Sequence, residues 1–181
     1  TRRELYDKAM ALAGRMQQAG VVKGDRVAAY APNVPETIIM MLAASTLGAV
    51  FSSCSPDFGY DGVRDRFGQI EPKILLACDG YHYASKAIDR LPLVADLVAA
   101  VPSINKTLII PYLNEQPDLS GFDNASLFAD ALSFTPVSGF TRIAFNDPLY
   151  ILYSSGTTGA PKCIVHGTGG TMLQHIKEHR L

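Results

Sequence analysis

The chain has 181 residues, a formal net charge of −1, 48% hydrophobic residues and 18% charged residues. This length can bury a substantial core, and the composition is that of an ordinary folded protein rather than a disordered one. A nearly neutral chain without a basic arm argues against a nucleic-acid-binding protein. The longest apolar run, at 37–50, is interrupted by Ser45, Thr46 and Gly48 and is shorter than the ~18 residues that suggest a membrane span.

Three cysteines, Cys54, Cys78 and Cys163, lie among apolar neighbours and show no CxxC spacing. An odd number of such residues favours buried thiols in a reducing compartment over a disulfide framework. The first four residues begin a charged amphipathic segment rather than the apolar run of a signal peptide. We therefore expect a cytoplasmic protein.

Short apolar strands alternate with helices along most of the chain. The first helix begins with a capping-box pattern at Thr1 and Glu4 and ends at Gly20. Apolar periodicity and turn residues then predict, in order, strand 26–30, helix 33–47, strand 49–51, helix 60–70, strand 73–77, helix 84–100 with a break at Pro92, and strand 107–110. This alternation indicates an α/β fold with a parallel sheet and flanking helices, and such sheets bind ligands beyond the carboxyl ends of their strands.

The remaining chain divides into two parts. Segment 114–142 is rich in proline, glycine and polar residues and is interpreted as a surface connection, with one short helix near 126–132. Segment 143–181 contains strand 149–153, a polar loop, strand 163–166, a glycine-rich turn at 167–170 and a closing helix at 171–181. We expect three units: an α/β subdomain at 1–113, the connection at 114–142, and the strand–loop–strand–helix segment at 143–181, truncated at its end.

The loop at 154–162, called here the phosphate loop, has the chemistry that a polyphosphate requires. Phosphate oxygens only accept hydrogen bonds, so they need converging donors and a backbone that can approach closely. Glycines allow consecutive amide groups to point inward as an anion nest, hydroxyls add donors, and a lysine adds positive charge. The residues predicted to bind ATP phosphates are Ser154, Ser155, Gly156, Thr157, Thr158, Gly159 and Lys162.

Two better-known glycine motifs do not match. The Walker pattern needs a glycine before the lysine and a Ser or Thr after it, whereas Pro161 and Cys163 stand at these positions. The stretch 167–172 lacks the last glycine of the dinucleotide fingerprint. The plain alternative is a flexible loop between two strands of a hairpin.

A second motif, HxxEH at 175–179, matches an inverted zinc-peptidase signature. His175 and His179 would share one helix face, but a catalytic zinc also needs a third protein ligand, and none can be assigned. We therefore interpret the motif as the polar face of an amphipathic helix and predict no protein metal site.

Residues 153–162 resemble the phosphate-loop signature of the adenylate-forming superfamily, which includes acyl-CoA synthetases, luciferases and peptide-synthetase adenylation domains. The signature reads aromatic, Ser/Thr, Ser/Thr, Gly, Ser/Thr, Thr, Gly, any, Pro, Lys, and every position matches. The stretches 23–28, 32–36 and 47–50 also resemble early landmarks of the superfamily. The resemblance implies that the chain is an incomplete portion of the large N-terminal domain of such an enzyme.

Three further stretches, 54–59, 66–73 and 162–181, most resemble the acetoacetyl-CoA synthetase family within that superfamily. The resemblance implies an acid–thiol ligase that activates a carboxylate with ATP, in the presence of magnesium, and transfers the acyl group to coenzyme A. It places Phe58, Gly59 and Lys86 near coenzyme A, although the spacing around Lys86 fits poorly and a solvated lysine is the simpler interpretation.

The family's catalytic lysine and its adenine and ribose contacts lie in later sequence, so no catalytic residue can be assigned here and the chain alone is expected to be inactive. The rival hypothesis is a nucleotide- or anion-binding module that uses the same loop without subsequent chemistry. The ligase hypothesis predicts that pyrophosphate exchanges into ATP when a carboxylic acid is added, whereas the binding-module hypothesis predicts no such exchange.

Overall fold

A computed structural model describes residues 1–154 and 159–180. The phosphate-loop residues Ser155, Gly156, Thr157 and Thr158 lie outside the described residues, so their predicted roles are untested by the structure. In chain order the elements are α1 (Arg2–Gln18), β1 (Arg26–Tyr30), α2 (Pro35–Leu47), β2 (Val50–Cys54), α3 (Tyr60–Ile70), β3 (Ile74–Cys78), β4 (Gly80–Tyr83), β5 (Lys86–Asp89), α4 (Leu91–Ala100), β6 (Lys106–Ile110), β7 (Ala125–Leu127), α5 (Phe128–Ala131), β8 (Pro148–Ser154), β9 (Lys162–Gly167) and α6 (Thr168–Arg180).

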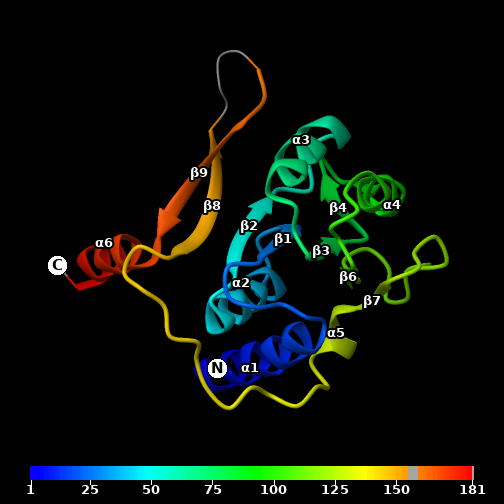
Figure 1. Cartoon of the computed structure of the whole chain (residues 1–181). Coiled ribbons are helices and arrows are strands. Elements are labelled where there is room, and N and C mark those ends of the chain that lie inside the picture. The colour runs from blue at the N-terminus through cyan, green and yellow to red at the C-terminus, as the bar shows by residue number, and fades with distance from the viewer. Residues whose placement is uncertain (155–158, 181) are drawn as a thin grey trace.

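The predicted parallel sheet is confirmed. Seven strands form one sheet in the order β7-β6-β3-β1-β2-β8-β9, and every neighbouring pair is parallel except β8 and β9 (Figure 1). β8 joins the sheet beside β2, with Phe51 opposite Tyr150 and Ser52 opposite Ile151. The carboxyl ends of β2 and β8 therefore lie at the same edge of the sheet, next to each other.

Helices cover both faces of this sheet, as buried parallel strands require. Alternate residues of β1 point to opposite sides: Val27 and Ala29 pack in the core under α1 and α2, whereas Ala28 and Tyr30 pack in the core under α3 and α4. Figure 1 shows the same division, with α1 and α2 on one side and α3 and α4 on the other. The capping box at Thr1 and Glu4 is present at the start of α1.

The predicted helix at 84–100 is wrong over its first part. Residues 80–89 form the antiparallel hairpin β4–β5, and α4 begins only at Leu91. Pro92 is at the start of this helix, where its missing N–H costs nothing, rather than at a break within it. Ala84 and Ser85 form the turn with positive φ angles of 47° and 64°, a conformation that neither residue type signals.

The connection at 114–142 contributes structure of its own. It contains β7, which pairs in parallel with β6 at the edge of the sheet, and α5, in which Phe128 and Ala131 are buried. Its later part crosses the outer side of α1 and α2, where the Val137 amide donates to the Met10 carbonyl at 3.2 Å and the Thr141 amide to the Thr46 carbonyl at 2.9 Å.

The glycine-rich stretch after β9 is helical, not a turn. α6 begins at Thr168, three residues earlier than expected, and its second residue packs on the Phe145 ring so closely that a Cβ at Gly169 would collide with it. A side chain at position 169 would therefore require the Phe145 ring to move. Within the described residues, no helix is long and apolar enough to cross a membrane.

Candidate active site

The phosphate loop connects two strands of an antiparallel hairpin. Ser154 ends β8, Lys162 begins β9, and the two residues are register partners. Gly159 has a φ of 92°, a left-handed conformation that favours glycine, and open space surrounds the position where a Cβ would be. Lys162 is exposed. Of the predicted phosphate ligands, the structure thus describes Ser154, Gly159 and Lys162, at the two ends of the loop.

Tyr153, immediately before the loop, is anchored in the sheet. Its hydroxyl is 3.0 Å from the Ser52 hydroxyl, which also donates to the Ile151 carbonyl at 2.8 Å. Burial raises the pKa of the Tyr153 phenol, so it remains a neutral hydrogen-bonding group. The strand that leads into the loop is therefore tied to β2 by side chains as well as by the sheet ladder.

The turn that follows β2 lies at the same sheet edge and contains Phe58 and Gly59. The hydroxyl of Tyr30, at the end of β1, lies 2.9 Å from the Pro56 carbonyl oxygen and 2.7 Å from the Phe58 carbonyl oxygen, so the two acceptors share its single proton. Burial raises the pKa of Tyr30 to about 12, which keeps this donor protonated. Phe58 and Gly59 are both exposed, and Gly59 precedes the first residue of α3.

The third component of this edge is the hairpin β4–β5, which is held against the turn after β2 by Arg90. The Arg90 guanidinium donates from Nε to the Pro56 carbonyl at 2.8 Å and from Nη2 to the Tyr81 hydroxyl at 3.1 Å, and it lies over the Tyr81 ring. Lys86 is exposed and begins β5 opposite Tyr83. Arg90 thus joins the two segments that the family resemblance places near coenzyme A.

Sequence reasoning missed Asp79, whose buried carboxylate organises the loop after β6. It accepts hydrogen bonds from the backbone amides of Tyr112 at 2.7 Å, Leu113 at 2.9 Å and Asn114 at 2.8 Å, and from the Asn114 side chain at 3.1 Å. Four donors compensate the cost of burying this charge. The available signal was an acidic residue directly after the fully apolar strand β3.

Other reactive side chains in the described residues do not form a second site. His175 and His179 stack on α6 with ring centroids 6.2 Å apart, but the described part of the chain contains no group of three or more potential metal ligands. Burial raises the pKa of Cys54 to about 12 and of Cys78 to about 11, so both thiols are poor nucleophiles near neutral pH.

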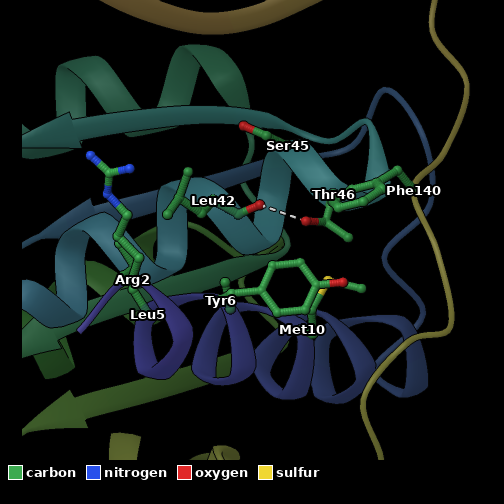
Figure 2. A pocket seen from close by; sticks show the side chains of 9 residues that line it. Arg2, Leu5, Tyr6, Met10, Leu42, Ser45, Thr46 and Phe140 are labelled. Atoms are coloured by element: carbon green, nitrogen blue, oxygen red, sulfur yellow. Dashed lines mark hydrogen bonds between the residues drawn. The ribbon is translucent and has the colours of Figure 1, made fainter.

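A hollow of about 290 Å³ lies between α1, α2 and Phe140 (Figure 2). Its lining is mainly apolar, with Tyr6, Met10 and Leu42 among the contributing side chains. None of the predicted site residues lines it. Among the described residues, Phe58 and Gly59 lie in the turn after β2, Lys86 lies in the hairpin after β3, and Ser154 is at the end of β8.

Comparison with known proteins identifies the family. The model of the AMP-binding enzyme family matches residues 1–180. This chain belongs to that family. It is 49% identical to the acetoacetyl-coenzyme A synthetase of Rhizobium meliloti over 97% of its own length, and 42% identical to the acetoacetyl-CoA synthetase of Macaca fascicularis over 98%.

A solved structure agrees with this family assignment. The acetoacetyl-CoA synthetase from Streptomyces lividans matches the whole of this chain with a TM-score of 0.93 and 38% sequence identity, and the match covers 27% of that chain. The chain likewise spans 28% of the length of the Rhizobium and Macaca relatives. This chain therefore has the fold of the corresponding part of an AMP-binding enzyme.

Proposed function

We propose that this chain is part of an ATP-dependent acid–thiol ligase whose carboxylic acid substrate is acetoacetate. A carboxylate oxygen attacks the α-phosphorus of ATP and pyrophosphate leaves; the sulfur of coenzyme A then attacks the acyl carbon of the adenylate and AMP leaves. The observation that carries the proposal is a complete family phosphate-loop signature at the end of β8, in a chain similar to acetoacetyl-CoA synthetases along its whole length.

Charge dictates the role of the phosphate loop. Because a carboxylate must approach a triphosphate, catalysis of the first step is mainly positioning and neutralisation of negative charge. The loop amides and the hydroxyls of Ser154, Ser155, Thr157 and Thr158 hold the β- and γ-phosphates, and Lys162 screens their charge. The same groups hold pyrophosphate as it leaves.

Magnesium enters this proposal with ATP, as part of the substrate. Among the described residues there is no group of three or more His, Cys, Asp or Glu side chains that could hold an ion. No protein ligand for the metal is assigned among the described residues.

Coenzyme A is assigned to the edge formed by the turn after β2 and the hairpin β4–β5. Phe58 and Gly59 offer an exposed ring and an open backbone position, and Lys86 offers a positive charge for a coenzyme A phosphate. Arg90 supports this assignment because it joins both segments through Pro56 and Tyr81.

The decisive experiment is acid-dependent exchange of labelled pyrophosphate into ATP by the full-length protein that contains this chain. Exchange should depend on acetoacetate and be weaker with acetate or butyrate. Lys162→Met should reduce it by a factor on the order of 10–100, because a charge aimed at the reacting phosphates is lost. Lys177→Met, an exposed lysine on α6, is the matched control and should leave exchange unchanged.

Two outcomes would separate this proposal from its rival. ATP binding without acid-dependent exchange would favour a nucleotide-binding module and refute the ligase. The 181-residue chain alone should show no turnover of acetoacetate, ATP and coenzyme A, since the family's catalytic lysine belongs to later sequence; measurable turnover by it would contradict that assignment.

A further inference from the structure

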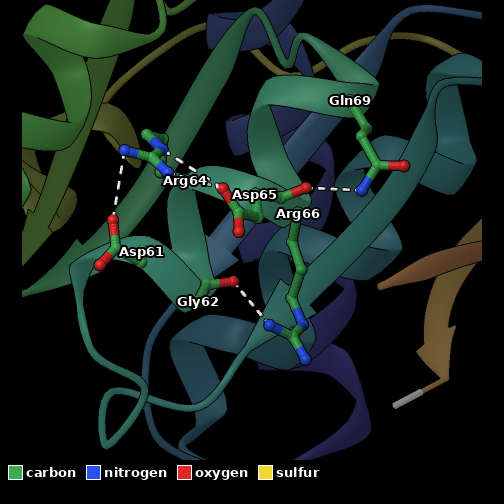
Figure 3. Close-up of polar contacts among 6 residues, drawn as sticks. All are labelled: Asp61, Gly62, Arg64, Asp65, Arg66 and Gln69. Atoms are coloured by element: carbon green, nitrogen blue, oxygen red, sulfur yellow. Dashed lines mark hydrogen bonds and ion pairs between the residues drawn. The ribbon is translucent and has the colours of Figure 1, made fainter. Parts of the chain in front are cut away.

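Helix α3 presents two side chains, Arg66 and Gln69, to the hairpin that carries the phosphate loop. Residues three apart on a helix lie on the same face. Figure 3 shows both side chains on the side of α3 that faces the end of the hairpin, whereas Asp61 and Arg64 lie on the other side. These contacts involve Tyr153, immediately before the phosphate loop, and Pro161, the next-to-last residue of the loop.

Gln69 holds the returning end of the loop. Its amide nitrogen donates to the Pro161 carbonyl at 3.0 Å, across 92 residues of sequence. The same nitrogen also donates to the Asp65 carbonyl one turn earlier in α3. A primary amide has two N–H donors, so one can orient the side chain on its own helix while the other holds Pro161.

Arg66 holds the leading end. Its guanidinium lies over the Tyr153 ring, 5.6 Å from the ring centroid, and over the Phe58 ring at 4.4 Å. Nη1 donates to the Gly62 carbonyl at 2.6 Å, which fixes the orientation of the planar group. The Tyr153 hydroxyl donates in turn to the Arg66 carbonyl at 3.4 Å. Arg66 therefore contacts both the strand before the phosphate loop and the turn after β2.

These contacts have a common consequence. A loop that binds a triphosphate through converging amides depends on the separation and direction of its two ends. Here the β8–β9 ladder joins the two ends, and both of them also contact α3. We propose that Arg66 and Gln69 are positioning residues for ATP: they hold the two ends of the phosphate loop in the arrangement that binds the β- and γ-phosphates. This inference rests on the proposed function of the loop.

The test uses full-length variants and two measurements, ATP affinity at equilibrium and the kinetics of acetoacetate-dependent pyrophosphate exchange. Gln69→Leu removes the donor while keeping a similar volume. It should raise the Kd and the KM for ATP by about two- to tenfold, the effect of one lost hydrogen bond, with the KM for acetoacetate unchanged. A merely structural defect would lower the amount of active protein, and hence kcat, without raising the KM for ATP.

Arg66→Lys distinguishes positioning from charge. Lysine keeps the positive charge but loses the planar group that stacks between Tyr153 and Phe58, so the variant should weaken ATP binding to a similar degree. The matched control is Arg64→Gln on the opposite side of α3, where Arg64 pairs with Asp61 and Asp65. This control should retain wild-type affinity for ATP.

The outcomes separate this inference from the proposed function. If the wild type is active and both Gln69→Leu and Arg66→Lys match Arg64→Gln in ATP affinity, the inference is wrong and the ligase assignment stands. If the wild type binds ATP without acid-dependent exchange but the two variants bind it more weakly, the ligase assignment is wrong and the inference stands. Absence of ATP binding by the wild type would overturn both.

Discussion

Residues 1–113 and residues 143–181, called here the body and the hairpin segment, are built from similar elements but differ greatly in burial. β3 is buried at every residue, and β1 at every residue after Arg26. In β9 and the described residues of α6, Thr171 alone is buried. Large apolar side chains of the hairpin segment are exposed: Phe145, Leu152, Ile164, Val165, Met172, Leu173 and Ile176.

This difference separates the residues that form most of the buried core from those that carry the proposed phosphate loop. The body supplies most of the buried side chains of the two cores, to which Phe128, Ala131 and Ile151 also contribute. The hairpin segment carries the phosphate loop, and its position depends on pairing with β2 and on a few side-chain contacts, including Ser52 with Tyr153 and Gln69 with Pro161. The proposed site therefore lies at the junction of the two regions.

The largest expected effect on the free energy of unfolding is that of truncating a buried leucine in the body, compared with an exposed leucine in the hairpin segment. Leu76→Ala, in the fully buried strand β3, should lower the free energy of unfolding by about 2–5 kcal/mol because it removes core contacts and leaves a cavity. Leu173→Ala, on exposed α6, should change it by less than about 0.5 kcal/mol. Denaturant unfolding measures the free energy of both variants. Equal losses would contradict the proposed difference in stability contribution between the body and the hairpin segment.

Asp79→Asn should have the next largest effect. The amide places an N–H group where the carboxylate accepts four hydrogen bonds, so about 3 kcal/mol of unfolding free energy should be lost. Asp118→Asn is a suitable control, because this exposed carboxylate accepts from the Ser120 amide within its own loop. Comparable losses of unfolding free energy in the two variants would show that the burial of Asp79 does not account for its contribution to stability.

Tyr30→Phe should cost about 1 kcal/mol at neutral pH, because the hydroxyl that donates to the turn after β2 is lost. The folded pKa of Tyr30 is about 12, above its ordinary value of 10.0, so the hydroxyl's contribution is fully present below pH 10 and is lost as pH rises through about 12. The difference in unfolding free energy between the wild type and the variant should therefore become smaller as the pH rises from 10 towards 12. A difference independent of pH would mean that folding does not raise the pKa of Tyr30.

The smallest expected effects on the free energy of unfolding come from breaking two ion pairs, one partly buried and one exposed. Lys73 donates to Asp25 at 2.7 Å and to the Gly20 carbonyl, and only 13% of the Asp25 side chain is exposed. Lys73→Met should cost about 1 kcal/mol, whereas Lys177→Met, which breaks an exposed pair with Glu178, should cost less than about 0.5 kcal/mol. Unfolding at low and high salt would check this, since the exposed pair should show the greater relative sensitivity to screening.

Much of the architecture could be read from local pattern. The strands around Ala28, Leu76, Leu108 and Ile151 are short apolar runs between turn signals, and each lies in the predicted place. The hairpin β4–β5 could not be recognised, because its turn uses Ala84 and Ser85 in left-handed conformations rather than glycine or asparagine. Its apolar residues, Ala87 and Ile88, continue the spacing of α4 and so suggested one longer helix.

The amino-acid sequence by itself determined the α/β character of the chain, the place of the phosphate loop after an apolar strand, and the resemblance to its family. These properties depend on residues close together in the sequence: the apolar periodicity of each element and the motif of the phosphate loop. Only the tertiary structure decided that β8 lies beside β2, and that Arg66 and Gln69 reach Tyr153 and Pro161 across 87 and 92 residues. Such contacts depend on strand order and helix placement, which are set by the packing of the whole chain and leave no local signal.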